Sequence, residues 1–166
     1  YNSGIHLKVS DCERNGQAEV GFIGRVLLNA FNAWEYGWQS NREELKVNST
    51  KIFDSYLKNG FTEAGFLKES VIYDKNFEDP VHSIRRQSEG LYAIFHFLAY
   101  EKEKGRKHPE WEQRLKNMLN MFLQLQNADG SFPRKFRDDF TIVDKSGGST
   151  PSATLPLVMG YKYFKD

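Results

Sequence analysis

Apolar residues recur at steps of three and four along most of the chain, which is the spacing of one face of an α-helix. The pattern predicts five helices, over residues 17–38, 40–59, 84–104, 109–126 and 151–165. Two stretches that lack this spacing, residues 61–82 and 128–150, are predicted to be long connections. Connections of this length inside a domain are usually functional or disordered, and the aromatic and charged residues in both favour function. The predicted order is therefore two helices, a long connection, two more helices, a second long connection and one last helix.

The chain also repeats itself. Gln17-Ala18-Glu19 opens the first predicted helix, and Gln87-Ser88-Glu89 lies at the start of the third, 70 positions later. Repetition of this kind is typical of helical units that bury their apolar faces against each other. We expect an all-α fold of antiparallel helical hairpins, with the first, third and fifth helices side by side and roughly parallel. Residues 1–166 are interpreted as one helical domain, a fragment of a larger ring.

Three features indicate how the helices begin and end. Ser40 followed by Glu43 has the pattern of a capping box for the second helix. Gly60 is expected to end that helix in the left-handed conformation that glycine tolerates. Pro156 lies inside the last predicted helix and is expected to kink that helix or to delay its start.

Composition excludes several classes of function. The formal net charge is +1, from 23 basic and 22 acidic residues, so the chain has no general attraction for nucleic acid. No apolar run is long enough to cross a membrane. Cys12 is the only cysteine, which excludes an internal disulfide and a thiolate metal cluster. Aromatic residues make up 14% of the chain, and this excess suits both a core and a sugar-stacking surface.

Glu19 and Glu89 are the candidate catalytic residues. If the odd-numbered helices line the inside of a ring, the two glutamates lie at the same end of it. A pair of carboxylates across a cleft is what glycosidic hydrolysis requires, one as acid and one as base or nucleophile. The alternative is that each glutamate only stabilises the positive end of its helix dipole.

Other polar residues are candidates for binding substrate around this pair. Gln17 and Gln87 share the repeated motif, while Arg86 and His82 lie just before it. Asp144 precedes a flexible Gly147-Gly148 stretch, and Trp38 near a helix end is able to stack on a sugar. His96 is expected to be a partly buried histidine with satisfied hydrogen bonds. The spacing of histidines and acidic residues predicts no metal site and no cofactor.

The opening Gln-x-Glu motifs and the stretch Leu125-Gln126-Asn127-Ala128-Asp129-Gly130-Ser131-Phe132 resemble (α/α) toroids. Within that class, the chain is similar to the six-hairpin glycosidases and to the toroid domains of polysaccharide lyases. The same stretch resembles, more distantly, the repeat of the terpenoid cyclases. A closed ring of six hairpins needs more than twice this length. The resemblance implies carboxylates at the ends of the inner helices, here Glu19 and Glu89.

These observations favour part of a carbohydrate-active enzyme, a glycoside hydrolase or a polysaccharide lyase. A lyase would use His82 with Tyr73 or Tyr92 instead of paired glutamates. The alternatives are a non-catalytic helical binding module and a terpenoid-cyclase-like domain. The expected partners are carbohydrate and either a second copy or the remaining part of the parent chain, and the expected location is periplasmic or extracellular.

Overall fold

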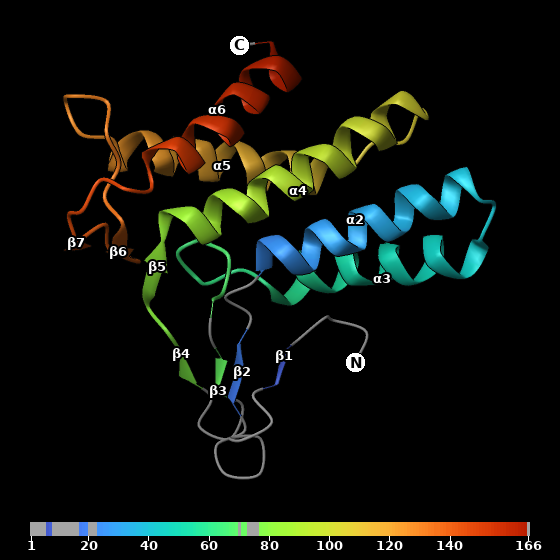
Figure 1. Ribbon diagram of the computed structural model, residues 1–166, viewed down its shortest axis with the longest axis horizontal. Helices are drawn as coiled ribbons and strands as arrows, with labels where there is room; N and C mark the ends of the chain where they lie inside the picture. Colours follow the sequence, from blue (N-terminus) through green and yellow to red (C-terminus); the bar gives the residue numbers. More distant parts are fainter. Residues whose placement is uncertain (1–5, 8–16, 20–22, 70, 73–76, 166) are drawn as a thin grey trace.

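The computed structural model describes residues 6–7, 17–19, 23–69, 71–72 and 77–165 (Figure 1). It confirms a mainly helical chain with helices close to the five predicted ones. The helices are α2 (Ile23–Gln39), α3 (Glu43–Asn59), α4 (Ile84–Glu103), α5 (Pro109–Leu125) and α6 (Thr150–Phe164).

The helices form two layers. The inner layer has α4 at its centre, with α2 packed on one side and α6 on the other, as predicted for the first, third and fifth helices (Figure 1). The outer layer consists of α3, which packs on α2, and α5, which packs on α4 and α6. Short turns join α2 to α3 and α4 to α5, so both long connections lie at the opposite end of the layers.

The long connections contain short antiparallel strands. A four-stranded sheet has the order β1 (His6–Leu7), β2 (Gln17–Glu19), β3 (Val71–Ile72) and β4 (Phe77–Glu78). A three-stranded sheet has the order β5 (Val81–Ser83), β6 (Lys135–Arg137) and β7 (Ile142–Asp144). The second sheet joins the two long connections, because β5 belongs to the first connection and β6 and β7 belong to the second.

The prediction that the first helix opens at Gln17 is wrong. Residues Gln17–Glu19 form β2, with Gln17 opposite Ile72 of β3 and Glu19 opposite His6 of β1, and α2 begins only at Ile23. The backbone hydrogen bonds of β2 are made with β1 and β3, and β3 is distant in sequence. The local spacing of apolar residues does not reveal this kind of pairing. Glu19 on a strand and Glu89 inside α4 are therefore not at equivalent positions of two helices.

Two predicted caps of α3 are also wrong. Ser40 donates its hydroxyl hydrogen to the carbonyl oxygen of Tyr36 at 2.6 Å, and α3 follows Arg42, whose side chain makes no capping bond. Gly60 ends α3 with φ of −91°, which is not left-handed. Its lack of a side chain matters for a different reason, the close approach of Tyr56.

Replacing Gly60 with alanine is expected to lower the free energy of unfolding by about 1–3 kcal/mol, the usual cost of overpacking. A Cβ at this position would lie 2.7 Å from the carbonyl oxygen of Tyr56, so backbone has to move. Gly147→Ala is the control, since a Cβ there meets no described atom within 4 Å. Urea unfolding of both variants checks the prediction, and equal stabilities would contradict it.

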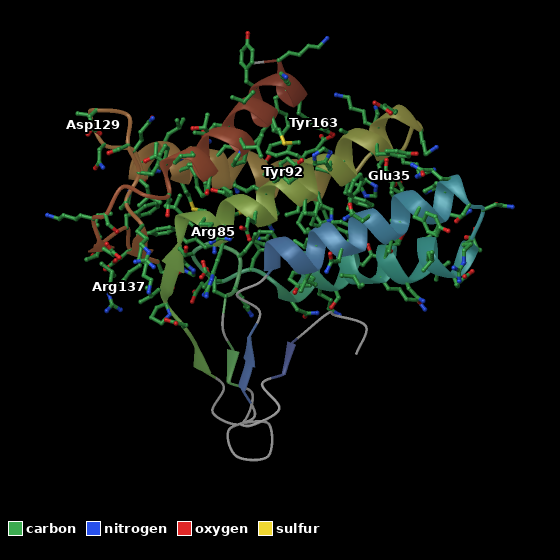
Figure 2. All side chains as sticks on the ribbon, in the orientation of Figure 1. Glu35, Arg85, Tyr92, Asp129, Arg137 and Tyr163 are labelled. Atoms are coloured by element: carbon green, nitrogen blue, oxygen red, sulfur yellow. The ribbon has the colours of Figure 1, made fainter. Side chains whose placement is uncertain are left out.

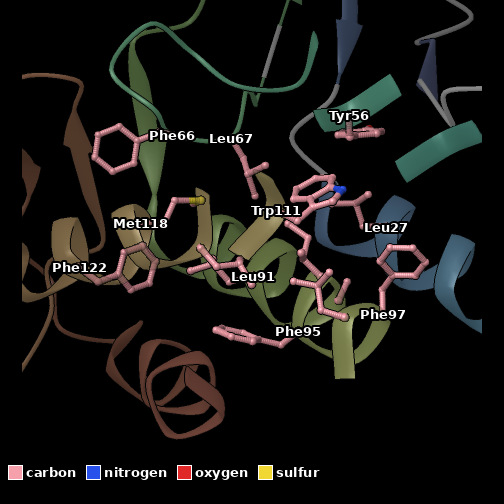
Figure 3. Packing of buried hydrophobic residues seen from close by; sticks show 14 of the residues in the cluster. Leu27, Tyr56, Phe66, Leu67, Leu91, Phe95, Phe97, Trp111, Met118 and Phe122 are labelled. Atoms are coloured by element: carbon pink, nitrogen blue, oxygen red, sulfur yellow. The ribbon is translucent and has the colours of Figure 1, made fainter. Parts of the chain in front are cut away.

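Aromatic side chains dominate the core between the two layers. Phe53 of α3 stacks on Phe97 of α4 with ring centroids 4.0 Å apart, and Trp111 of α5 packs edge-on against Phe53 at 6.4 Å. All three are nearly free of solvent contact. Figure 3 shows Phe97 and Trp111 in this cluster together with Leu27 of α2. The core thus joins α2, α3, α4 and α5 into one unit.

A buried carboxylate links the end of α4 to the start of α5. Glu101, with its side chain 6% exposed, accepts hydrogen bonds from Arg106 at 2.6 and 2.8 Å and lies 2.8 Å from His108 Nε2. Burial alone would raise the pKa of Glu101, but the hydrogen bonds and charges of Arg106 and His108 outweigh it and lower this pKa below 4.5.

Because the pKa of Glu101 is lower in the folded protein than in the unfolded chain, the ionised side chain stabilises the fold above about pH 4.5. This stabilisation is lost as the pH falls through the pKa of the folded state. Glu101→Gln is expected to cost roughly 2 kcal/mol of unfolding free energy at pH 7, the scale of charged hydrogen bonds. The difference from the unmodified protein should shrink at pH 4. Urea unfolding at both pH values measures it, and a difference that grows in acid would exclude this role.

α6 leaves several apolar side chains exposed. Leu155, Val158 and Tyr161 recur at three-residue steps on α6, and Tyr161 is 69% exposed. Association through this surface stays a prediction. No described helix combines the length and apolar character that a membrane span needs.

Candidate functional site

A cavity of about 360 Å³ lies at the N-terminal end of α4, where the two long connections meet. Charged and polar side chains dominate its lining. They come from both connections and from the first turns of α4, and include Glu69, His82, Arg85, Arg86, Glu89, Arg134 and Lys135. Arg134, Lys135 and Ser149 of the second connection also line the cavity.

The local backbone explains how these elements meet. Ser83 is extended, with φ of −111° and ψ of 125°, so β5 leads directly into α4. Opposite Ser83 in the sheet stands Lys135 of β6, and opposite Val81 stands Arg137. In addition, the backbone N–H of Ile84 donates to the carbonyl oxygen of Arg134 at 3.2 Å. The three-stranded sheet therefore places Arg134 and Lys135 beside the first turn of α4.

Glu69 is the most buried carboxylate of the cavity. Its Oε1 accepts hydrogen bonds from the Ser83 backbone N–H at 2.7 Å and from Gln87 Nε2 at 2.9 Å. Its Oε2 accepts one from Arg86 at 3.3 Å. Burial raises the pKa of Glu69, while these donors and the nearby positive charges oppose the rise. Glu69 thus fixes the start of α4 and the direction of Arg86.

His82 lies fully buried behind the cavity. Its Nε2 is 2.8 Å from Oδ1 of Asp138, which also accepts a hydrogen bond from the Thr62 hydroxyl at 3.2 Å. The imidazole packs against Phe66 and Phe136, with ring centroids 5.0 and 5.5 Å away. Within the described residues, His82 Nδ1 has no hydrogen-bond partner. The side chain joins the two connections and leaves one nitrogen unused.

Arg85 and Glu89 form an ion pair one turn apart on α4, with Nε and Oε1 separated by 2.9 Å. The side chain of Glu89 remains 32% exposed, so its carboxylate is accessible from the cavity. The pair therefore holds the Glu89 carboxylate at a position that a bound molecule can reach.

The structure brings three of the sequence-predicted residues together and places others elsewhere. His82, Arg86 and Glu89 line one cavity. Gln87 is fully buried and does not face it. Its amide donates to the Leu67 carbonyl oxygen at 2.7 Å and accepts from the Leu67 N–H at 2.9 Å, so it holds the first connection against α4.

The remaining candidates do not line this cavity. Asp144 accepts hydrogen bonds from Ser146 and lies 3.4 Å from Arg134, so it contributes through that arginine. Trp38 is at the opposite end of α2, where Lys46 and Arg106 lie over its ring at 4.4 and 4.9 Å.

Gln17 and Glu19 lie on β2, and their side chains are outside the described residues. Tyr73, the predicted alternative lyase base, also lies outside the described residues.

Sequence reasoning missed Glu69. The only available signal was a carboxylate two residues after Leu67, close to Gly65 and Phe66 of the first connection. Among the described residues, no group of three or more histidine, cysteine, aspartate or glutamate side chains is arranged to hold a metal ion.

No protein-family model matches the chain, and no curated protein is significantly similar to it. Solved structures share its fold. A cellobiose 2-epimerase from Bacillus thermoamylovorans aligns with 92% of this chain and 41% of its own, at a TM-score of 0.69 and 14% identity. A D-mannose isomerase aligns with 90% of this chain and 44% of its own, at a TM-score of 0.57 and 15% identity.

An unsaturated glucuronyl hydrolase from Bacillus sp. GL1, responsible for degrading glycosaminoglycan, aligns with 97% of this chain and 50% of its own. Its TM-score is 0.59 and its identity is 14%. These enzymes are (α/α) toroids, so the resemblance is confirmed for the fold. The chain spans half or less of the length of each of these structures. It therefore has the fold of part of an (α/α) toroid.

Proposed function

We propose that this chain is part of a carbohydrate-active enzyme, a glycoside hydrolase, with the cavity at the start of α4 as its site. The observation that carries the proposal is the cavity itself, which unites Glu89, Glu69 and four cationic side chains on a toroid fold. The similar structures act on cellobiose, D-mannose and unsaturated glucuronyl sugars, and this supports a sugar as the ligand.

Glu89 is proposed to act as the base or nucleophile. It is an accessible carboxylate of the cavity, and its ion pair with Arg85 holds it in place. Glu69 is a positioning residue, since all its hydrogen bonds go to protein groups that shape the cavity. Glu19 remains the proposed second carboxylate. Its strand β2 pairs with β3, in the same connection that carries Glu69.

The cationic side chains favour an acidic sugar. Arg85, Arg86, Arg134 and Lys135 line the cavity together with the carboxylates of Glu69, Asp79 and Glu89. Arginine forms bidentate hydrogen bonds with carboxylates. This lining therefore suits a substrate that carries a uronic acid group.

The test is to incubate the full-length protein with cellobiose, D-mannose and an unsaturated glucuronyl disaccharide, and to follow the products by proton NMR. Hydrolysis appears as new reducing ends, epimerisation as a changed anomeric pattern without cleavage, and elimination as a new vinyl proton. The proposal expects cleavage, fastest for the acidic disaccharide. An epimer would identify an isomerase instead, and no turnover of any sugar would favour the non-catalytic helical module.

A further inference from the structure

One face of α4 continues from the cavity along the inner layer. Arg85, Glu89, Tyr92 and His96 follow each other at steps of four, three and four, and all are exposed or half-buried. The residues on the other sides of the helix, such as Leu91 and Phe95, are buried. Residues at this spacing share one face of a helix. Arg85 and Glu89 line the cavity, so this face begins there and leads away from it.

A second group of polar side chains lies farther along this face. The ring of His96 packs edge-on against Tyr92 with centroids 4.4 Å apart, and lies 5.4 Å from the ring of Phe31 on α2. Glu35, also on α2, is close enough for its charge to act on His96. Figure 2 shows Tyr92 on α4 and Glu35 on the neighbouring helix α2.

These side chains are not engaged with each other by hydrogen bonds. Among the described residues, none donates to or accepts from the Glu35 carboxylate, the Tyr92 hydroxyl or the His96 imidazole. The expectation that His96 is partly buried is confirmed, and its ring nitrogens have no hydrogen-bond partner among the described residues. All three side chains are half-buried, so a ligand can reach their polar atoms. Burial lowers the pKa of His96, against the opposing charge of Glu35, so the imidazole is neutral near pH 7.

We propose that Glu35, Tyr92 and His96 form a second sugar-binding site on the inner layer, one that contacts hydroxyl groups of a neutral sugar ring. A carboxylate accepts two hydroxyl hydrogens, a neutral imidazole both donates and accepts, and a phenol does the same. The aromatic edges of Tyr92 and His96 give the ring an apolar surface.

The position of this site indicates the size of the ligand. Glu89 and His96 are seven residues apart on α4, which is about 10 Å along the axis. One sugar ring in the cavity and another beside His96 belong to one oligosaccharide that follows α4. This inference rests on the proposed function for the nature of the ligand, but it concerns binding and not the chemical step.

The experiment is isothermal titration calorimetry on the full-length protein with cellobiose and with an unsaturated glucuronyl disaccharide. His96→Phe keeps the ring packing against Phe31 and removes both nitrogens, and Glu35→Gln removes the charge. Each variant is expected to raise Kd about five- to tenfold, with the melting temperature unchanged, because each loses one or two hydrogen bonds to the ligand. Glu110→Gln, on exposed α5 surface, is the control and should leave Kd unchanged.

The outcomes separate this site from the catalytic proposal. Weaker binding by His96→Phe and Glu35→Gln supports the second site, whatever the activity of Glu89→Gln. Full turnover by Glu89→Gln would contradict only the catalytic role of Glu89. Conversely, if Glu89→Gln is inactive while both variants bind as tightly as the unmodified protein, the second site is refuted. Failure of the unmodified protein to bind either disaccharide also refutes it.

Discussion

Glu89→Gln in the full-length protein is expected to lower kcat by ~10²–10⁴-fold, the usual cost of losing a general acid–base group. The amide has nearly the same shape but takes no proton, so the Michaelis constant should change little. Steady-state kinetics on the sugar that is turned over fastest measures the effect. The same substitution at Glu19 tests whether it is the second carboxylate.

Two controls make this result interpretable. Glu110→Gln changes an exposed carboxylate on α5 that is remote from the cavity and should leave kcat unchanged. The melting temperature of Glu89→Gln should stay close to that of the unmodified protein, because its ion pair with Arg85 is at the surface. A stable Glu89→Gln protein with full turnover would show that Glu89 has a structural role in α4 and no catalytic role.

Gln87→Leu is expected to lower the free energy of unfolding by about 3 kcal/mol or more. The substitution leaves three groups without their present partner: the N–H and carbonyl of Leu67 and the carboxylate of Glu69. Each buried group without a partner costs about 1–3 kcal/mol. Urea unfolding gives the change directly.

The matched control for this prediction is Gln113→Leu. Gln113 is an exposed glutamine on α5 whose amide donates to Asn117 of the same helix, so its loss should change stability by no more than about 0.5 kcal/mol. If Gln87→Leu unfolds at the same urea concentration as Gln113→Leu, Gln87 does not hold the first connection in place.

The helices were predictable because their apolar spacing is a local property. Four of them begin within a few residues of the expected positions, and Pro109 and Gly105 correctly mark the boundary between α4 and α5. The start of α2 was not predictable in this way. Gln17 is held by Ile72, a strand partner more than fifty residues away, and helical spacing carries no information on such pairing.

Part of the candidate site was also visible in the sequence. His82, Arg86 and Glu89 line one cavity, because residues before and within the first turns of one helix lie close together. Gln87 was expected to contact the ligand together with Glu89, but residues two positions apart point to different sides of a helix. Glu69 joins the site through folding of a connection that has no periodic pattern, so its role required the three-dimensional structure.

A crystal structure of the full-length Glu89→Gln variant with the oligosaccharide that the unmodified protein cleaves fastest tests the proposed site directly. We expect a sugar ring in the cavity at the start of α4, in contact with residue 89 and the cationic lining, and a second ring beside His96 on the same face. A sugar bound elsewhere, for example beside Trp38 at the opposite end of α2, would contradict the proposed site.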